Sequence, residues 1–128
     1  MRYLLDTHTA MWALMGEKSK LSKKAMTITD NLSISLYASV VSVWEIAIKT
    51  SIGKSNFEGG SIAFVEKLKE SGVGVLDLKP QHIAHIEKLP LLHRAPFDRM
   101  LISITIAESM TIVSADENIH KYDVMWIW

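Results

Sequence analysis

The chain has 128 residues, of which 48% are hydrophobic, and this size and composition predict a single domain, residues 1–128, with a substantial core. Lys plus Arg and Asp plus Glu number 14 each, so the net charge is zero and any nucleic-acid contact has to rely on a local basic patch. The absence of cysteine excludes disulfides and thiolate metal sites and agrees with a reducing compartment. No apolar run approaches the roughly 20 residues of a membrane span, so a cytoplasmic protein without a membrane partner is expected.

Apolar periodicity along the chain predicts strands that alternate with helices. The predicted strands are 2–5, 33–38, 73–78, 111–114 and 124–128. The predicted helices are 7–15, 21–30, 41–52, 61–71, a short helix from residue 80, 96–109 and a turn at 116–121. Within 61–71, the side chains of Ile62, Val65 and Leu68 are expected to face inward. This alternation predicts an α/β fold with a mostly parallel central sheet.

Four carboxylates stand where a predicted strand ends or a predicted helix begins: Asp6, Glu45, Asp98 and Asp116. Such places share one edge of a parallel sheet, and ligands of open α/β folds bind at that edge. Carboxylates gathered in a poorly hydrated site do not all stay ionised and unpaired. A hard divalent cation such as Mg²⁺ relieves their repulsion, so the pattern predicts metal-assisted phosphodiester chemistry.

Each of these acids also has an ordinary structural explanation. Asp6 and Asp116 are well placed to be helix N-caps, and Asp98 lies in a helix first turn, where the helix dipole favours a negative charge. Glu45 is the fourth residue of a possible capping box that begins at Ser42. For Asp6 the two explanations are evenly balanced, whereas for Asp116 taken alone the cap is the better one.

Helical spacing separates Glu45 and Asp98 from the other two acids. Glu45 falls in an apolar arc of its helix, together with Val41, Trp44, Ile48 and Ile52. Asp98 lines up in the same way with Leu101, Ile102 and Thr105. A carboxylate on the buried side of a helix costs several kcal/mol unless it is paired or bound to a metal, so both positions favour a site.

Basic side chains in or beside the acidic motifs are candidates for phosphate contact: Lys49, His93, Arg94 and Arg99. For Lys49 and Arg99 an ion pair with one of the acids or a neighbour is the alternative. Ser114 is a candidate to orient Asp116 or a water, with a backbone hydrogen bond as the alternative. His8 is interpreted as structural, and the lysine cluster 18–24 as a solvated face.

At these residues the chain resembles the PIN-domain family, in particular the VapC-type toxins of toxin–antitoxin pairs. The resemblance runs through Leu4-Leu-Asp-Thr-His, Ser42-Val-Trp-Glu-Ile-Ala-Ile-Lys, His93-Arg-Ala-Pro-Phe-Asp-Arg-Met-Leu-Ile and Ser114-Ala-Asp, and it ends with Tyr122 and Val124. It implies an α/β/α sandwich and a Mg²⁺- or Mn²⁺-dependent endoribonuclease. It also implies a homodimer and a cognate antitoxin that inserts into the active-site groove.

The resemblance assigns the catalytic, metal-binding quartet to Asp6, Glu45, Asp98 and Asp116. Asp6 and Asp98 would hold a metal directly, while Glu45 and Asp116 would act through water or a second metal. Metal-activated water would then attack the phosphodiester and expel the ribose 3′-oxygen. The aromatic tail 124–128 is expected to be a buried edge strand or, alternatively, to place Trp126 or Trp128 in a dimer or antitoxin surface.

One departure from the family pattern is Ala95, where relatives commonly have Asp. If Pro96 is the first helical residue, Ala95 is the N-cap, so the sequence predicts a lost cap rather than a lost metal ligand. The main alternative function is a catalytically degenerate PIN domain that binds RNA or a protein without cutting. Phosphoryl-acceptor folds fit less well, because His8 stands where a haloacid-dehalogenase-type hydrolase needs a second Asp.

Overall fold

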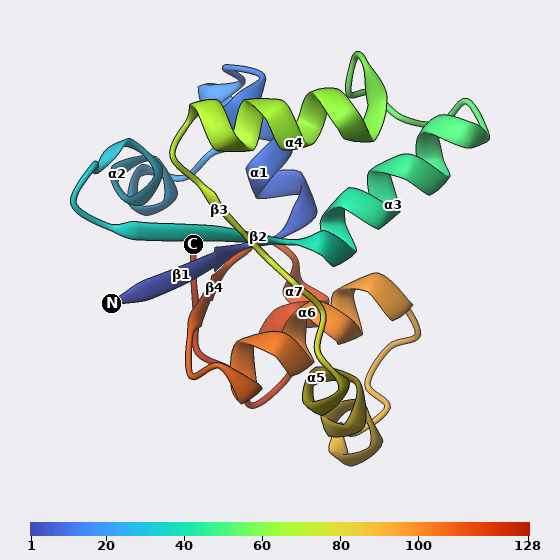
Figure 1. The fold of residues 1–128 in the computed structure, drawn as a ribbon. Coiled ribbons are helices and arrows are strands. Elements are labelled where there is room, and N and C mark those ends of the chain that lie inside the picture. The colour runs from blue at the N-terminus through green and yellow to red at the C-terminus, as the bar shows by residue number, and fades with distance from the viewer.

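Five parallel strands form the central sheet of the computed structural model, which describes all residues 1–128 (Figure 1). The strands are β1 (Arg2–Leu5), β2 (Ser35–Ser39), β3 (Gly74–Leu76), β4 (Thr111–Val113) and β5 (Trp126–Ile127). Their order is β3-β2-β1-β4-β5, so β1 lies in the middle, and Leu4 pairs with Tyr37 on one side and Ile112 on the other. The predicted parallel α/β fold is confirmed, and every strand pairing is parallel.

Four helices cover one face of this sheet: α1 (Thr7–Leu14), α2 (Lys23–Asp30), α3 (Val40–Ser51) and α4 (Gly60–Glu70). Figure 1 shows α1, α2 and α4 together above the sheet, while α3 leads away from the end of β2. Leu5 from β1 packs there with Ala10, Ile46, Phe64 and Leu68 in one apolar core. A short 3₁₀ turn, Lys18–Lys20, joins α1 to α2.

The opposite face carries α5 (Pro80–His85), α6 (Pro96–Ala107) and α7 (Glu117–His120), with a 3₁₀ turn at Ile86–Lys88 (Figure 1). Here Leu4 and Ile112 of the sheet pack against Leu101 of α6 and Ile119 of α7 in a second core. Leu4 and Leu5 therefore serve opposite cores, and both are almost fully buried. This explains why β1 is apolar throughout its second half, as expected for a parallel strand covered on both faces.

Two details of the predicted elements are wrong. Ile62 was expected to face inward, but its side chain is 74% exposed, and Phe64 is buried in its place. Helix α4 begins at Gly60, so its inner stripe runs through Gly60, Phe64 and Leu68 at a spacing of four residues. The predicted strand 124–128 is reduced to Trp126–Ile127 at the edge of the sheet.

The tail forms the expected edge strand at Trp126–Ile127, and its two tryptophans lie in different surroundings. The ring of Trp128 lies 6.1 Å from that of Trp12 and packs against the first core, whereas Trp126 is 44% exposed and stacks on His120 with ring centroids 3.5 Å apart. The structure thus uses Trp128 to fix the edge strand on α1 and leaves Trp126 at the surface. Every helix falls short of the length and apolarity that crossing a bilayer requires.

Candidate active site

Asp6 and Asp116 follow the carboxyl ends of the neighbouring strands β1 and β4 and cap the helices that come next. One oxygen of Asp6 accepts the N–H of Thr9 at 2.8 Å, and one oxygen of Asp116 accepts the N–H of Asn118 at 2.9 Å. The cap explanation is therefore correct for both residues. Each cap bond uses only one oxygen of its carboxylate, so capping does not remove either acid from the site.

Ser114 connects the two acids. Its buried hydroxyl donates a hydrogen bond to the second oxygen of Asp6 and accepts one from the backbone N–H of Asp116 at 3.0 Å. The N–H of Asp6 donates to the carbonyl of Val113 at 3.2 Å, which extends the pairing of β1 with β4 beyond the strands. These bonds fix the relative positions of Asp6 and Asp116.

Glu45 reaches the same edge from α3 and is 7% exposed. The hydroxyl of Thr7 donates to one of its oxygens at 2.8 Å, and the ammonium of Lys49 donates to the other at 2.7 Å. Helix α3 begins at Val40 with Ser39 as its N-cap, so Glu45 lies in the second turn and the capping box from Ser42 is wrong. The hydroxyl of Ser42 lies 2.8 Å from that of Thr7 instead.

The burial of Glu45 is confirmed, but the apolar arc proposed as its reason is not on the inner face. Trp44, Ile48 and Ile52 are 55%, 36% and 59% exposed, and the buried residues of α3 are Val41, Ser42, Glu45 and Ile46. The inner face is thus centred on small and polar side chains next to Thr7. Trp44 turns outward and meets Phe97 of α6 edge to face, with ring centroids 4.9 Å apart.

Asp98 stands in the first turn of α6 and completes the group. Burial and then the negative charges of Asp116, Glu45 and Asp6, in that order, raise its pKa to about 6, while His93 acts in the opposite direction. Burial also raises the pKa of Asp6, although the hydrogen bonds from Ser114 and Thr9 oppose the rise. Asp98 therefore lies within electrostatic range of all three other acids.

The donor chemistry of this group fits a hard divalent cation. Lys49 pairs with Glu45, but no lysine or arginine forms an ion pair with Asp6, Asp98 or Asp116. No three Asp, Glu or His side chains stand close enough together to form a ready-made metal cage. Mg²⁺ does not need such a cage, because it keeps several waters and takes one or two carboxylates directly.

Two hollows adjoin the acids. The first is lined by Asp6, His8, Trp12, Ala115 and Asp116. The second, of about 440 Å³, shares His8 and Trp12 with it and continues past Lys20, Lys49 and Lys54 between α1 and the end of α3. We call the combined lining of the two hollows the basic cleft; Glu17 lines it beside Lys20.

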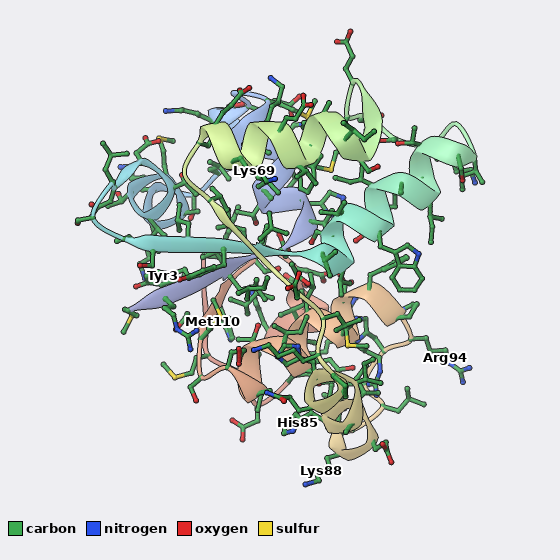
Figure 2. The ribbon with its side chains drawn as sticks, viewed as in Figure 1. Tyr3, Lys69, His85, Lys88, Arg94 and Met110 are labelled. Carbon is green, nitrogen blue, oxygen red and sulfur yellow. The ribbon has the colours of Figure 1, made fainter.

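Of the other candidate cations, Arg99 is engaged within the protein, whereas Arg94 is exposed. Arg99 donates to the carbonyl of Pro90 at 2.8 Å and to the hydroxyl of Tyr122 at 3.0 Å, so its guanidinium is engaged within the protein. Arg94 projects from the loop before α6, away from the body of the protein (Figure 2). In the lysine cluster, Lys18 pairs with Asp30 at 3.2 Å and Lys20 with Glu17 at 2.9 Å.

Sequence reasoning did not identify the roles of three polar residues: Thr7, which bonds Glu45, Ser42, which bonds Thr7, and Tyr122, which bonds His93 and Arg99. Thr7 and Ser42 lie inside the sequence motifs that contain Asp6 and Glu45. A hydroxyl so close to a carboxylate that is expected to be buried could have been predicted to bond it. Tyr122 marked only the end of the resemblance. Its partners His93 and Arg99 lie more than 20 residues away in sequence, and no local pattern predicts such a contact.

Ala95 is the N-cap of α6 and makes no side-chain cap bond, as the sequence predicts. Ala95→Asp should supply the missing acceptor and increase the free energy of unfolding by about 1 kcal/mol, which corresponds to roughly 3–6 °C in Tm. Thermal unfolding in EDTA measures the change. Ala95→Asn is the matched control, because it caps without adding charge. An unchanged Tm together with a sharp rise in nuclease activity would contradict the cap interpretation.

The protein is an α/β/α sandwich whose parallel sheet carries acidic residues at its carboxyl edge. Residues 3–125 match the model of the PIN domain, and the chain belongs to the PIN-domain family. A search of curated protein sequences finds no match.

Solved structures share the fold over the whole chain. The VapBC2 complex of Rickettsia felis, bound to a DNA fragment from its promoter, superposes with a TM-score of 0.71 and 18% identity over 99% of this chain and 98% of that one. DNA-bound VapBC of Salmonella typhimurium superposes with a TM-score of 0.67 and 15% identity, over 100% of this chain and 97% of that one. VapBC-1 of nontypeable Haemophilus influenzae superposes with a TM-score of 0.61 and 20% identity, over 99% of this chain and 97% of that one. These likenesses establish the predicted α/β/α architecture.

Proposed function

We propose that the chain is a Mg²⁺- or Mn²⁺-dependent endoribonuclease that acts as the toxin of a toxin–antitoxin pair in the cytoplasm. The observation that carries this proposal is the convergence of Asp6, Glu45, Asp98 and Asp116, in which Asp98 has a pKa of about 6 and three of the acids form no ion pair with a lysine or arginine. Clustered, partly desolvated carboxylates favour a divalent cation. Membership of the PIN family and the likeness to VapBC structures support the assignment.

In this proposal Asp6 and Asp98 hold the metal directly, and Glu45 and Asp116 act through water or a second metal. A bound Mg²⁺ or Mn²⁺ would lower the pKa of a water and stabilise charge on the scissile phosphate. The protein contributes orientation: Ser114 and Thr9 fix the carboxylate of Asp6, and Thr7 and Lys49 fix that of Glu45. Pre-set carboxylates need no rearrangement when charge develops in the transition state.

The basic cleft supports RNA as the substrate. Single strands bind to proteins through cations that follow the backbone and aromatic rings that stack on bases. Lys20, Lys49 and Lys54 supply the cations, and the ring of Trp12, 5.7 Å from that of His8, lies between them and the acids. Lys20 pairs with Glu17 and Lys49 with Glu45, so Lys54 is the lysine of this cleft that makes no ion pair.

The outward side of α3 supports a protein partner. Trp44, Ile48 and Ile52 form a row of exposed apolar side chains on this helix. A contiguous patch of exposed apolar side chains commonly marks a surface that binds another protein. A cognate antitoxin and a second copy of the chain are the two partners proposed for the protein.

Cleavage of an RNA panel by the purified chain tests the function. We expect cutting with Mg²⁺ or Mn²⁺, none with EDTA, and products that end in a 5′-phosphate and a 3′-hydroxyl, because water rather than the 2′-hydroxyl attacks. A single 2′-deoxy substitution at the cut site should therefore be tolerated. A product with a 2′,3′-cyclic phosphate, or activity in EDTA, would contradict the mechanism.

Binding measured in EDTA and cleavage measured with metal together separate a nuclease from a degenerate module that only binds RNA. The double variant Lys20→Gln/Lys54→Gln should weaken binding of a single-stranded RNA and reduce the slope of log K against log salt by about 1.4, or about 0.7 per phosphate contact. Lys67→Gln/Lys69→Gln, which alters two exposed lysines of α4, is the matched control. Binding without cleavage in any metal would establish the degenerate alternative.

A further inference from the structure

A chain of hydrogen bonds lies behind Asp98 and involves none of the other three acids. The hydroxyl of Tyr122 lies 2.8 Å from Nδ1 of His93 and accepts a hydrogen bond from Arg99 at 3.0 Å. Tyr122 is 4% exposed, and the side chain of His93 is 12% exposed. On the other side of the imidazole, Nε2 stands 3.7 Å from the Oδ2 atom of Asp98.

The direction of these bonds assigns the tautomer of His93. Arg99 can only donate, so the oxygen of Tyr122 is the acceptor in the first bond. The single proton of Tyr122 is then donated to Nδ1 of His93, because the hydroxyl makes no other hydrogen bond. An imidazole that accepts at Nδ1 carries its proton at Nε2.

The proton on Nε2 has no partner within the protein. Nε2 of His93 is one of only two buried side-chain nitrogen or oxygen atoms that lack a hydrogen bond, and it faces Asp98. Buried polar atoms are nearly always satisfied, so an unpaired donor next to a carboxylate calls for an explanation. Hydrogen bonds of catalytic groups are often long in the absence of substrate and shorten when the substrate is bound.

We propose that His93 is a positioning residue for Asp98, held by Tyr122 and Arg99 so that its Nε2–H donates to Oδ2 and leaves the other carboxylate oxygen free for a metal. This inference rests on the proposed function, because it concerns the same metal site. Partners that orient the ligands of a metal typically change its affinity by 10–100-fold when they are removed. His93 thus acts through Asp98 and does not itself touch the substrate.

Two measurements on the intact chain test this role. Long-range ¹H–¹⁵N NMR should find His93 with its proton on Nε2 in the wild type, and a mixture of both tautomers in Tyr122→Phe. Mn²⁺ titration by EPR should give a Kd about 10–100-fold weaker in His93→Leu. His93→Gln, whose amide N–H₂ can take the place of Nε2–H, should recover most of that loss.

Each alternative result has a distinct meaning. A His93→Leu protein that is folded and binds Mn²⁺ like the wild type would overturn the positioning role while leaving the metal site intact. A wild-type tautomer with the proton on Nδ1 would also overturn it. If His93→Leu fails to fold, Tyr122→Phe decides instead: a wild-type tautomer and a wild-type Kd for Mn²⁺ in this variant would overturn the positioning role. A wild-type chain that binds no Mn²⁺ would overturn the proposed function and this inference together.

Discussion

Replacing Asp98 with Asn is expected to lower metal-dependent RNA cleavage by about 10²–10³-fold or more and, in EDTA, to raise the Tm by several degrees. Activity falls because the amide cannot supply the charge that a divalent cation needs. Stability rises because the carboxylate is partly buried beside Asp116, Glu45 and Asp6, all of which disfavour its ionised form. Catalytic positions that carry such strain commonly gain stability when they lose function.

Two further variants make the result specific. Asp6→Asn should also abolish cleavage, and it should preserve the fold because Asn caps a helix about as well as Asp. Glu66→Gln removes an exposed acid of α4 and should change neither cleavage nor Tm. Cleavage rates and thermal unfolding in EDTA measure both effects. Wild-type rates in Asp6→Asn and Asp98→Asn would show that the site is misassigned.

The second large effect concerns pH. In the metal-free folded protein the pKa of Asp98 is raised from 3.8 to about 6, so between pH 4 and 6 the folded state binds more protons than the unfolded state. The free energy of unfolding must therefore fall as the pH rises through this window, by on the order of 1–3 kcal/mol from this residue. The raised pKa of Asp6 adds a contribution of the same sign.

A saturating divalent cation should reverse this dependence, because it binds the ionised carboxylates. Metal affinity should then fall as the pH drops below about 6, and the stabilisation by metal should fall with it. Tm measured against pH in EDTA and in excess Mg²⁺ gives both curves. Asp98→Asn is the control that removes the contribution of this residue and leaves that of Asp6. Identical pH profiles for the variant and the wild type would contradict the prediction.

Much of the fold could be predicted because its signals are local. Strand β1 has the predicted bounds, and Pro96 begins α6 as its fixed backbone angle favours. The parallel sheet followed from the alternation of strands and helices. The end of the chain was harder, because an apolar run predicts a strand but does not say how many of its residues find a partner, and only Trp126–Ile127 pair with β4.

The site shows where local reasoning ends. Helical periodicity led to the correct prediction that Glu45 is buried. It could not say which side of α3 faces the sheet, and Trp44 and Ile48 of the same predicted arc are exposed. That side is decided by tertiary partners such as Thr7, which bonds Glu45 from another helix. The Tyr122–His93 contact likewise depends on how the loop before α6 folds back against the segment after α7.

The strand order has a consequence for how the molecule becomes active. β1, β2 and β3 and the helices between them come from the first 76 residues, whereas β4 and β5 come from the last 18. The acids are divided in the same way: Asp6 and Glu45 belong to the earlier segment, Asp116 to the later one, and Asp98 to helix α6 just before it. Neither segment alone carries the full quartet, and only the pairing of β1 with β4 brings the two pairs of acids together. Under the proposed function, cleavage therefore requires the completed sheet, because a partly folded chain lacks the full quartet.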